Sequence, residues 1–191
     1  MTTAINLATS WSRQRLCQVL DGQGVIAYPT EAVWGLGCNP WSEFAVDTIL
    51  ALKQRPMHKG LILVAASVEQ INFLLDPLPA EVHERAQQHW PGPVTCVVPD
   101  VHRQIPDWVR GDHDTIAVRV SAHPLVQQLC RLAGMPLVST SCNPAGREPA
   151  RAPWQVRRYF PDGIDLMVSG SLGESRQPST IIDITTGRKL R

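Results

Sequence analysis

The sequence predicts a single α/β domain built on a mixed sheet. Short apolar runs rich in valine and isoleucine alternate with amphipathic stretches, a pattern typical of this fold class. Strand-like runs outnumber what a simple alternation of strand and helix requires, so we expect both parallel and antiparallel neighbours. The length of 191 residues suits one domain, residues 1–191, with one hydrophobic core.

The first half of the chain is expected to hold two main helices. Residues 10–20 have a helical pattern that the turn at Gly22 and Gly24 ends, and Ser42 can cap a helix that continues to Gln54. Strands are expected over residues 25–28 and 61–65. Residues 29–40 are expected to form a loop, since they are punctuated by glycine and proline.

In the second half, prolines mark helix starts. Helices are expected from Pro79 to about Trp90, from Pro124 to Gly134 and from Pro153 to Tyr159, after a short helix that begins at Ser67. Strands are expected over residues 94–98, 115–120, 136–139, 164–168 and 180–184. The strand at 136–139 continues directly into a polar loop, residues 140–149.

Composition excludes several classes of protein. With 43% hydrophobic and 18% charged residues the chain is neither disordered nor a coiled coil, and no apolar run approaches the roughly 18 residues of a membrane span. The five cysteines form no C-x-x-C pair and their number is odd, which argues against a disulfide framework. We therefore expect a cytoplasmic globular protein without membrane contact, and no metal ligands from the protein.

Charge is unevenly distributed although the net charge is only +1. Residues 1–100 hold 6 positive and 9 negative charges, whereas residues 101–191 hold 12 and 8. Fifteen arginines against three lysines suit the recognition of planar anions, or reflect the composition of the genome. A basic second half is compatible with binding to nucleic acid.

Two polar clusters in the first half are candidates for a site, because ligands in open α/β sheets bind beyond the carboxyl ends of strands. Thr30 and Glu31 follow a predicted strand; the alternative is an ordinary connection with Glu31 in solvent. Lys53 and Arg55 lie near a helix C-terminus, where cations compensate the helix dipole. As a site, an ammonium beside a guanidinium would neutralise a polyphosphate.

A third cluster, Ser139 to Asn143, follows an apolar strand. A plain turn would explain it, but its hydroxyls can also donate to phosphate or carboxylate oxygens. Ser179 is a similar, weaker candidate. Arg119 lies inside an apolar strand, where an unpaired charge would be costly.

Taken together in chain order, these segments resemble the threonylcarbamoyl-AMP synthases of the YrdC type. The resemblance runs from about residue 10 to the C-terminus and is specific because several motifs occur jointly. They are Pro29-Thr30-Glu31 with Gly35-Leu36-Gly37, Lys53-x-Arg55-Pro56, Val118-Arg119, Ser139-Thr140-Ser141-x-Asn143 and Ser179-Thr180.

The resemblance implies a twisted open sheet flanked by helices, with a concave basic cavity. It implies an L-threonylcarbamoyladenylate synthase, a nucleotidyltransferase that makes threonylcarbamoyl-AMP and pyrophosphate from L-threonine, bicarbonate or CO2, and ATP. Mg²⁺ is expected with ATP. A separate threonylcarbamoyl transferase complex would then modify position 37 of tRNAs that read codons beginning with A. The length resembles the short bacterial form, without the extra C-terminal domain of longer relatives.

Site residues are implied position by position. Thr30, Arg119, Ser139 and Ser179 resemble the threonine-binding set. The ATP-binding set would be Lys53, Arg55, Thr115, Ser141, Asn143 and Arg191, with Lys53 and Arg55 supplying electrostatic catalysis. Trp34, Lys59 and Cys142 depart from the commoner pattern and are assigned no role.

Two other functions fit part of the sequence. One is an RNA-binding module for tRNA or double-stranded RNA without catalysis of its own, which the arginine-rich second half would allow. The other is a carbamoyl-handling enzyme of hydrogenase maturation that contains a YrdC-like domain. Such enzymes are much longer and carry cysteine motifs that this sequence lacks.

Overall fold

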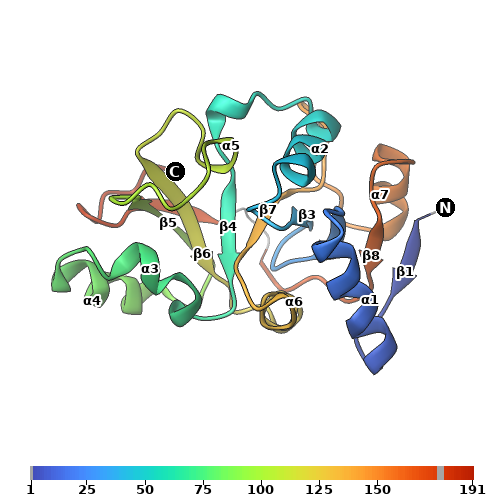
Figure 1. The fold of residues 1–191 in the computed structure, drawn as a ribbon, viewed down its shortest axis with the longest axis horizontal. Coiled ribbons are helices and arrows are strands. Elements are labelled where there is room, and N and C mark those ends of the chain that lie inside the picture. The colour runs from blue at the N-terminus through green and yellow to red at the C-terminus, as the bar shows by residue number, and fades with distance from the viewer. Residues whose placement is uncertain (1, 176–178) are drawn as a thin grey trace.

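Nine strands form one mixed sheet in the computed structural model, which describes residues 2–175 and 179–191 (Figure 1). Across the sheet the order is β1-β8-β2-β3-β7-β4-β6-β5-β9. Four neighbouring pairs are parallel and four are antiparallel, so the predicted mixed, open sheet is confirmed. The strands are β1 (Thr3–Ile5), β2 (Ile26–Pro29), β3 (Trp34–Cys38), β4 (Ile62–Ala65), β5 (Val94–Pro99), β6 (Thr115–Val120), β7 (Leu137–Ser141), β8 (Leu166–Val168) and β9 (Thr180–Asp183).

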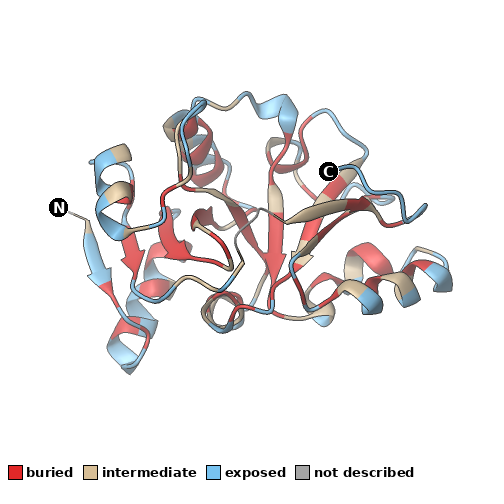
Figure 2. Cartoon of the chain, turned by 180° about the vertical axis from the view of Figure 1, so that it is seen from behind, coloured by how far each residue is buried: buried red, intermediate tan, exposed pale blue. Residues whose placement is uncertain are grey.

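Helices flank the sheet on both faces. They are α1 (Ser10–Asp21), α2 (Glu43–Lys53), α3 (Asn72–Leu75), α4 (Ala80–His89), α5 (Asp107–Arg110), α6 (Pro124–Ala133) and α7 (Pro153–Tyr159), with short 3₁₀ turns η1 (Met57–Lys59) and η2 (Val68–Ile71). Ser42 caps α2 as predicted, its side chain accepting from the amide of Ala45. Figure 2 shows the central strands as buried, the edge strand β1 as largely exposed and the outer helix surfaces as exposed.

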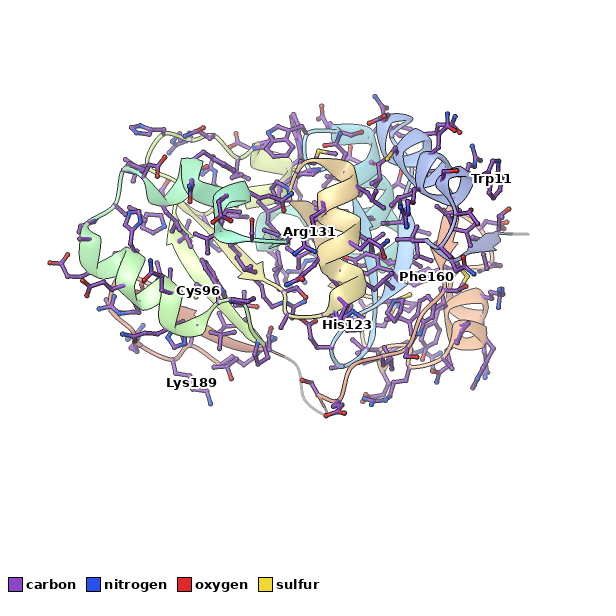
Figure 3. All side chains as sticks on the ribbon, turned by 90° about the horizontal axis from the view of Figure 1, so that it is seen from below. Trp11, Cys96, His123, Arg131, Phe160 and Lys189 are labelled. Atoms are coloured by element: carbon purple, nitrogen blue, oxygen red, sulfur yellow. The ribbon has the colours of Figure 1, made fainter. Side chains whose placement is uncertain are left out.

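Alternation along the strands divides the apolar core between the two faces of the sheet. On one face Leu63 packs in a cluster with Ile49 of α2. On the other face Val64 packs in a cluster with Leu129 of α6 and residues of α1. Figure 3 shows α6 lying along this second face, with His123 at its start.

The prediction that residues 29–40 form a loop is wrong, because β3 lies within them. All five residues of β3 are buried between β2 and β7. The two glycines that suggested a loop are needed for this packing: a Cβ on Gly37 would lie 2.9 Å from Tyr28 Cε1 and 2.6 Å from Val138 O. Strand β1 at the sheet edge was also not predicted.

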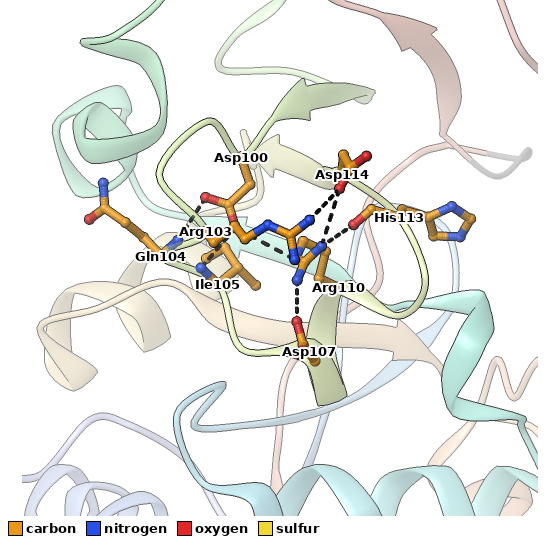
Figure 4. A network of polar contacts seen from close by, with 8 residues as sticks. All are labelled: Asp100, Arg103, Gln104, Ile105, Asp107, Arg110, His113 and Asp114. Carbon is orange, nitrogen blue, oxygen red and sulfur yellow. Dashed lines mark hydrogen bonds and ion pairs between the residues drawn. The ribbon is translucent and has the colours of Figure 1, made fainter.

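The loop between β5 and β6 is ordered by a buried carboxylate and guanidinium. Asp100 accepts from the amides of Gln104 and Ile105 at 2.8 and 2.9 Å, and its Oδ2 lies 3.8 Å from Nε of Arg110 (Figure 4). Arg110 in turn ends α5, which packs on η1; the amide of Leu61 donates to Val109 O at 2.8 Å. The Asp100 network therefore fixes the segment that precedes β4.

Among the described residues, no helix combines the length and the apolar character that crossing a lipid bilayer would require.

Candidate active site

A cavity of about 400 Å³ opens on the second face of the sheet. The strand registers place Ser139 of β7 between Gly37 and Ile62, and Ile62 beside Ala117 of β6. Residues on opposite strands in register share a face, so one row of small and polar side chains forms the floor. Thr30, from the β2–β3 turn, and the C-terminal segment after β9 complete the wall.

Seven of the ten predicted site residues line this cavity: Thr30, Arg55, Arg119, Ser139, Ser141, Ser179 and Arg191. Lys53 and Asn143 line an adjoining cavity of about 180 Å³, which shares Arg55, Lys59, Thr140 and Ser141 with the first. Thr115 lines neither cavity. It begins β6, four residues before Arg119 on the same face, and pairs with Pro99 of β5.

The hydroxyls of the predicted threonine set are held by neighbouring side chains or backbone. Ser139 Oγ accepts from the hydroxyl of Tyr28 at 2.8 Å, and burial raises the pKa of that tyrosine, which keeps it protonated. Ser179 Oγ accepts from Thr95 Oγ1 at 2.9 Å. Thr30 Oγ1 donates to Val33 O at 2.8 Å. Ser139 and Ser179 therefore keep their own hydrogens for a ligand, whereas Thr30 can only accept from one.

Lys53 holds the loop that follows β7 instead of facing the larger cavity. Its ammonium donates to the carbonyls of Ser141 and Asn143, the latter at 2.9 Å, and the side chain is buried. Burial, together with the nearby charge of Arg55, lowers the pKa of Lys53 to about 8, although Cys142 opposes this shift. Sequence reasoning placed this ammonium on the ATP phosphates; in the structure it acts on the Ser141-to-Asn143 backbone.

Arg55 is oriented by the segment before β4. Its Nη2 donates to Gly60 O at 2.8 Å and its Nε donates to the same carbonyl at 3.1 Å. Burial lowers the pKa of its guanidinium. Gly60 has φ +59°, and a Cβ there would lie 2.6 Å from Arg110 O. Only glycine allows this close approach of η1 to α5, and it is this approach that presents the Gly60 carbonyl to Arg55.

Glu31 belongs to a predicted candidate cluster, but sequence reasoning assigned it no role and left open that it lies in solvent. It lies in the cavity wall with 13% of its side chain exposed. Its Oε1 accepts from Ser121 Oγ at 2.6 Å, and its Oε2 lies 3.6 Å from Nη2 of Arg119. Because Arg119 lies in an apolar strand, it needs a negatively charged partner, and this need was the signal in the sequence that could have pointed to Glu31. The partner lies in a turn 88 positions earlier, so its identity could not be read from the sequence.

Arg191 reaches the cavity because the C-terminal residues fold back along β9. The amide of Ile181 donates to Arg191 O at 3.1 Å, and Nη2 of Arg191 donates to Ser179 O at 3.3 Å. With Arg55, Lys59 and Arg119, it makes four cationic side chains among the described lining residues, against one acidic side chain, Glu31. The cavity is therefore basic, as expected.

The described residues contain no group of three or more His, Cys, Asp and Glu side chains arranged to hold a metal ion. Four of the five cysteines, including Cys142, are buried, and burial raises the pKa of the Cys142 thiol to about 12.

Comparison with known proteins identifies the family. Residues 18–191 match the Sua5/YciO/YrdC family model, whose description reads "Telomere recombination". The chain belongs to this family. It is 70% identical to a threonylcarbamoyl-AMP synthase of Marinobacter nauticus over 91% of this chain and 90% of the relative. It is 53% identical to a threonylcarbamoyl-AMP synthase of Pseudomonas aeruginosa over 97% of this chain and 99% of that relative.

Solved structures of the family have the same fold. Sua5 of P. abyssi in complex with L-threonine superposes with a TM-score of 0.87 at 33% identity, over 96% of this chain. The chain spans 55% of the length of that protein. E. coli YciO superposes with a TM-score of 0.82 at 22% identity, over 96% of this chain and 90% of YciO, which supports the fold alone.

Proposed function

We propose that this chain is an L-threonylcarbamoyladenylate synthase, which forms threonylcarbamoyl-AMP and pyrophosphate from L-threonine, bicarbonate or CO2, and ATP. The observation that carries the proposal is the convergence of seven residues from separate segments on one basic cavity. The family membership and the 70% identity to a threonylcarbamoyl-AMP synthase support the same reaction.

L-Threonine would bind at the Arg119 end of the cavity. A guanidinium suits a carboxylate, and Ser139 and Ser179 have hydroxyl hydrogens free to donate to the same group. Thr30, whose own hydrogen is bonded to Val33, accepts from the threonine side-chain hydroxyl. The P. abyssi Sua5 structure contains L-threonine, which supports threonine as the ligand of this fold.

ATP would bind across both cavities. Arg55 and Arg191 bring positive charge to the triphosphate, and Ser141 donates from the shared wall. Lys53 acts on this site by fixing the carbonyls of Ser141 and Asn143, so it is a positioning residue in the free enzyme. We keep Thr115 as a proposed ATP contact at the start of β6, although it lies outside both cavities.

The reaction needs positioning and charge neutralisation more than a nucleophile from the protein. A carbamate oxygen of the substrate attacks the α-phosphorus, and pyrophosphate leaves. The described part of the lining has one acidic side chain, Glu31, which is too few for a protein set of oxygen ligands, so Mg²⁺ would be held by phosphates and water and would supply charge neutralisation there.

The product would pass to a threonylcarbamoyl transferase complex for modification of tRNA. Direct contact with tRNA is a further part of the proposal, and one surface region favours it. Residues 144–160 carry four exposed arginines and one glutamate, and a pocket of about 360 Å³ there is lined by Arg147, Trp154, Arg158 and Tyr159, with Pro144 and Gln155. Arginine and aromatic side chains together stack on unpaired bases. We refer to Arg147, Trp154, Arg158 and Tyr159 as the α7 patch.

The test is pyrophosphate release by the purified protein with Mg-ATP, omitting threonine and bicarbonate in turn. Release that requires both substrates, and a threonylcarbamoyl-AMP peak in the reaction mixture, is the expected result. Pyrophosphate release that is independent of threonine would refute the synthase assignment. No release together with retained RNA would favour the RNA-binding module.

A further inference from the structure

Glu31 and Arg119 form an ion pair in the cavity that is incomplete on both sides. Their charged atoms lie 3.6 Å apart, beyond hydrogen-bond distance, and each side chain is 13% exposed. Oε2 of Glu31 and Nε of Arg119 are both buried and have no hydrogen-bond partner among the described residues. A buried carboxylate and a buried guanidinium usually form hydrogen bonds with each other. Because Oε2 and Nε lack such bonds here, they are available to hydrogen-bond a ligand.

The protein holds Glu31 in this position through several contacts. Ser121 donates to Oε1 and is itself fixed, since its Oγ accepts from the amide of His123 at 3.1 Å and its carbonyl accepts from Gln127 Nε2 at 2.9 Å. The amide of Ser175 donates to Glu31 O at 3.1 Å. One carboxylate oxygen is therefore committed to the protein and the other is left for a partner.

The charges of the substrates identify that partner. ATP and bicarbonate are anions, and the α-ammonium of threonine is the only cationic group among the three substrates. Among the described residues of the lining, Glu31 is the only acidic side chain beside Arg55, Lys59, Arg119 and Arg191. An α-amino acid carries its ammonium and carboxylate on one carbon, so both could engage a carboxylate and a guanidinium placed side by side.

We propose that threonine inserts into the Glu31–Arg119 pair, with its carboxylate on Arg119 and its ammonium on Oε2 of Glu31, and that Glu31 accepts one proton from this ammonium. The inference rests on the proposed synthase function and adds a catalytic residue to it. The neutral amine then attacks the carbon of bicarbonate and forms the N–C bond. The bicarbonate hydroxyl leaves with the second N–H proton as water, which gives the carbamate.

Ligand binding tests the first half of the proposal. Calorimetry would compare L-threonine with the 2,3-dihydroxybutanoate of matching configuration, in which a hydroxyl replaces the amine. For the Glu31→Gln variant we expect threonine affinity to fall more than about tenfold, since hydrogen bonds to charged groups contribute about 1.5–3 kcal/mol. The hydroxy acid should bind this variant no more weakly than the wild-type protein. Glu84→Gln, an exposed glutamate of α4, is the matched control and should change neither affinity.

The wild-type protein alone also tests the contact, in case Glu31→Gln does not fold. It should bind threonine more than about tenfold more tightly than the hydroxy acid. Equal affinities, or equal losses of both ligands in Glu31→Gln, would overturn the proposal.

Turnover tests the proton transfer. Arg119 lies 3.6 Å from Glu31, the cavity lining adds Arg55, Lys59 and Arg191, and Tyr28 interacts electrostatically with Glu31 from β2. His123, whose backbone amide donates to Ser121 Oγ, is the titratable residue beside that serine. Because these remain in both proteins, the ratio of Glu31→Gln to wild-type kcat/KM for threonine isolates Glu31. This ratio should rise about tenfold per pH unit below the pKa of the free amine, since the variant must capture threonine already deprotonated. A ratio independent of pH would contradict the proton transfer. Wild-type protein that releases no pyrophosphate would instead refute the proposed function.

Discussion

Replacing Gly60 by alanine should disturb the site through the backbone that orients Arg55. Gly60 has φ +59° and ψ 174°, a conformation that is essentially restricted to glycine and costs other residues on the order of 1–3 kcal/mol. The new Cβ would also lie 2.6 Å from Arg110 O, 0.8 Å closer than the 3.4 Å at which ordinary contact begins. Both partners of this clash are backbone segments, so neither can rotate away.

Gly134 provides a matched control for the conformational part of this cost. It also has a positive φ, +68°, but lies in the ordinary left-handed region at the exposed end of α6, and a Cβ there meets nothing within 4 Å. We expect Gly134→Ala to lower the free energy of unfolding by about 1 kcal/mol, and Gly60→Ala to lower it by about 3 kcal/mol or more. For a chain of this size the melting temperature should fall by roughly 2–4 °C and 6–12 °C respectively.

Calorimetric melting and steady-state kinetics on the two variants measure both effects. In Gly60→Ala the Gly60 carbonyl moves away from Arg55, so the KM for ATP should rise, whereas Gly134→Ala should keep the wild-type value. Equal melting temperatures for the two variants would refute the steric reasoning. A normal KM for ATP in a destabilised Gly60→Ala protein would refute the link from Gly60 to Arg55.

Three further perturbations follow from the same contacts. Tyr28→Phe removes the hydrogen bond to Ser139 and should lower the free energy of unfolding by about 1 kcal/mol in denaturant titrations and raise the KM for threonine more than that for ATP; an unchanged ratio of the two KM values would argue against Ser139 as a threonine contact. The pKa of Lys53 is lowered to about 8 by burial, so the unfolded chain binds more protons than the folded one from pH 8 to 10.5. The stability of wild-type protein should therefore increase with pH relative to Lys53→Met over this range, by on the order of 3 kcal/mol, and parallel stability curves would refute the burial of a charged Lys53. Trp154→Ala in the α7 patch should weaken tRNA binding and leave pyrophosphate release unchanged, while Trp11→Ala, an equally exposed tryptophan outside the patch, should bind tRNA normally; equal binding by both would exclude the patch.

Much of the fold could be predicted because its signals are local. The period of apolar residues and the prolines at helix starts gave α2, α6 and α7 close to their observed bounds. Strand β3 could not be found this way, since Gly35 and Gly37 have low strand propensity and pair only because Tyr28 and β7 are already in place. Strand β3 is therefore determined by tertiary contacts and not by local sequence preference.

The site residues were predictable by type and position more than by orientation. An apolar run leads directly into Ser139 and Ser141, which was sufficient to place them near the carboxyl end of a strand, although β7 extends to Ser141 and the predicted strand ended at Ser139. The direction of the Lys53 ammonium toward the carbonyls of Ser141 and Asn143 depends on how α2 packs on β3, the neighbour of β7, and no spacing in the sequence encodes it. Glu31 was named in a candidate cluster but given no role for the same reason, because its partners Arg119 and Ser121 come from β6 and the turn after it.

Several departures from local rules lie at this site, and together they are an argument for its function that does not depend on the relatives. Glycines occupy the middle of a buried strand, Gly60 adopts a conformation closed to other residues, and Lys53 is buried with a depressed pKa. Glu31 and Arg119 each retain an unpartnered buried atom. Every one of these features costs stability, and stable folds normally avoid them away from functional sites. All of them lie in or against the two adjoining cavities, where bound substrates would complete contacts that the protein leaves open.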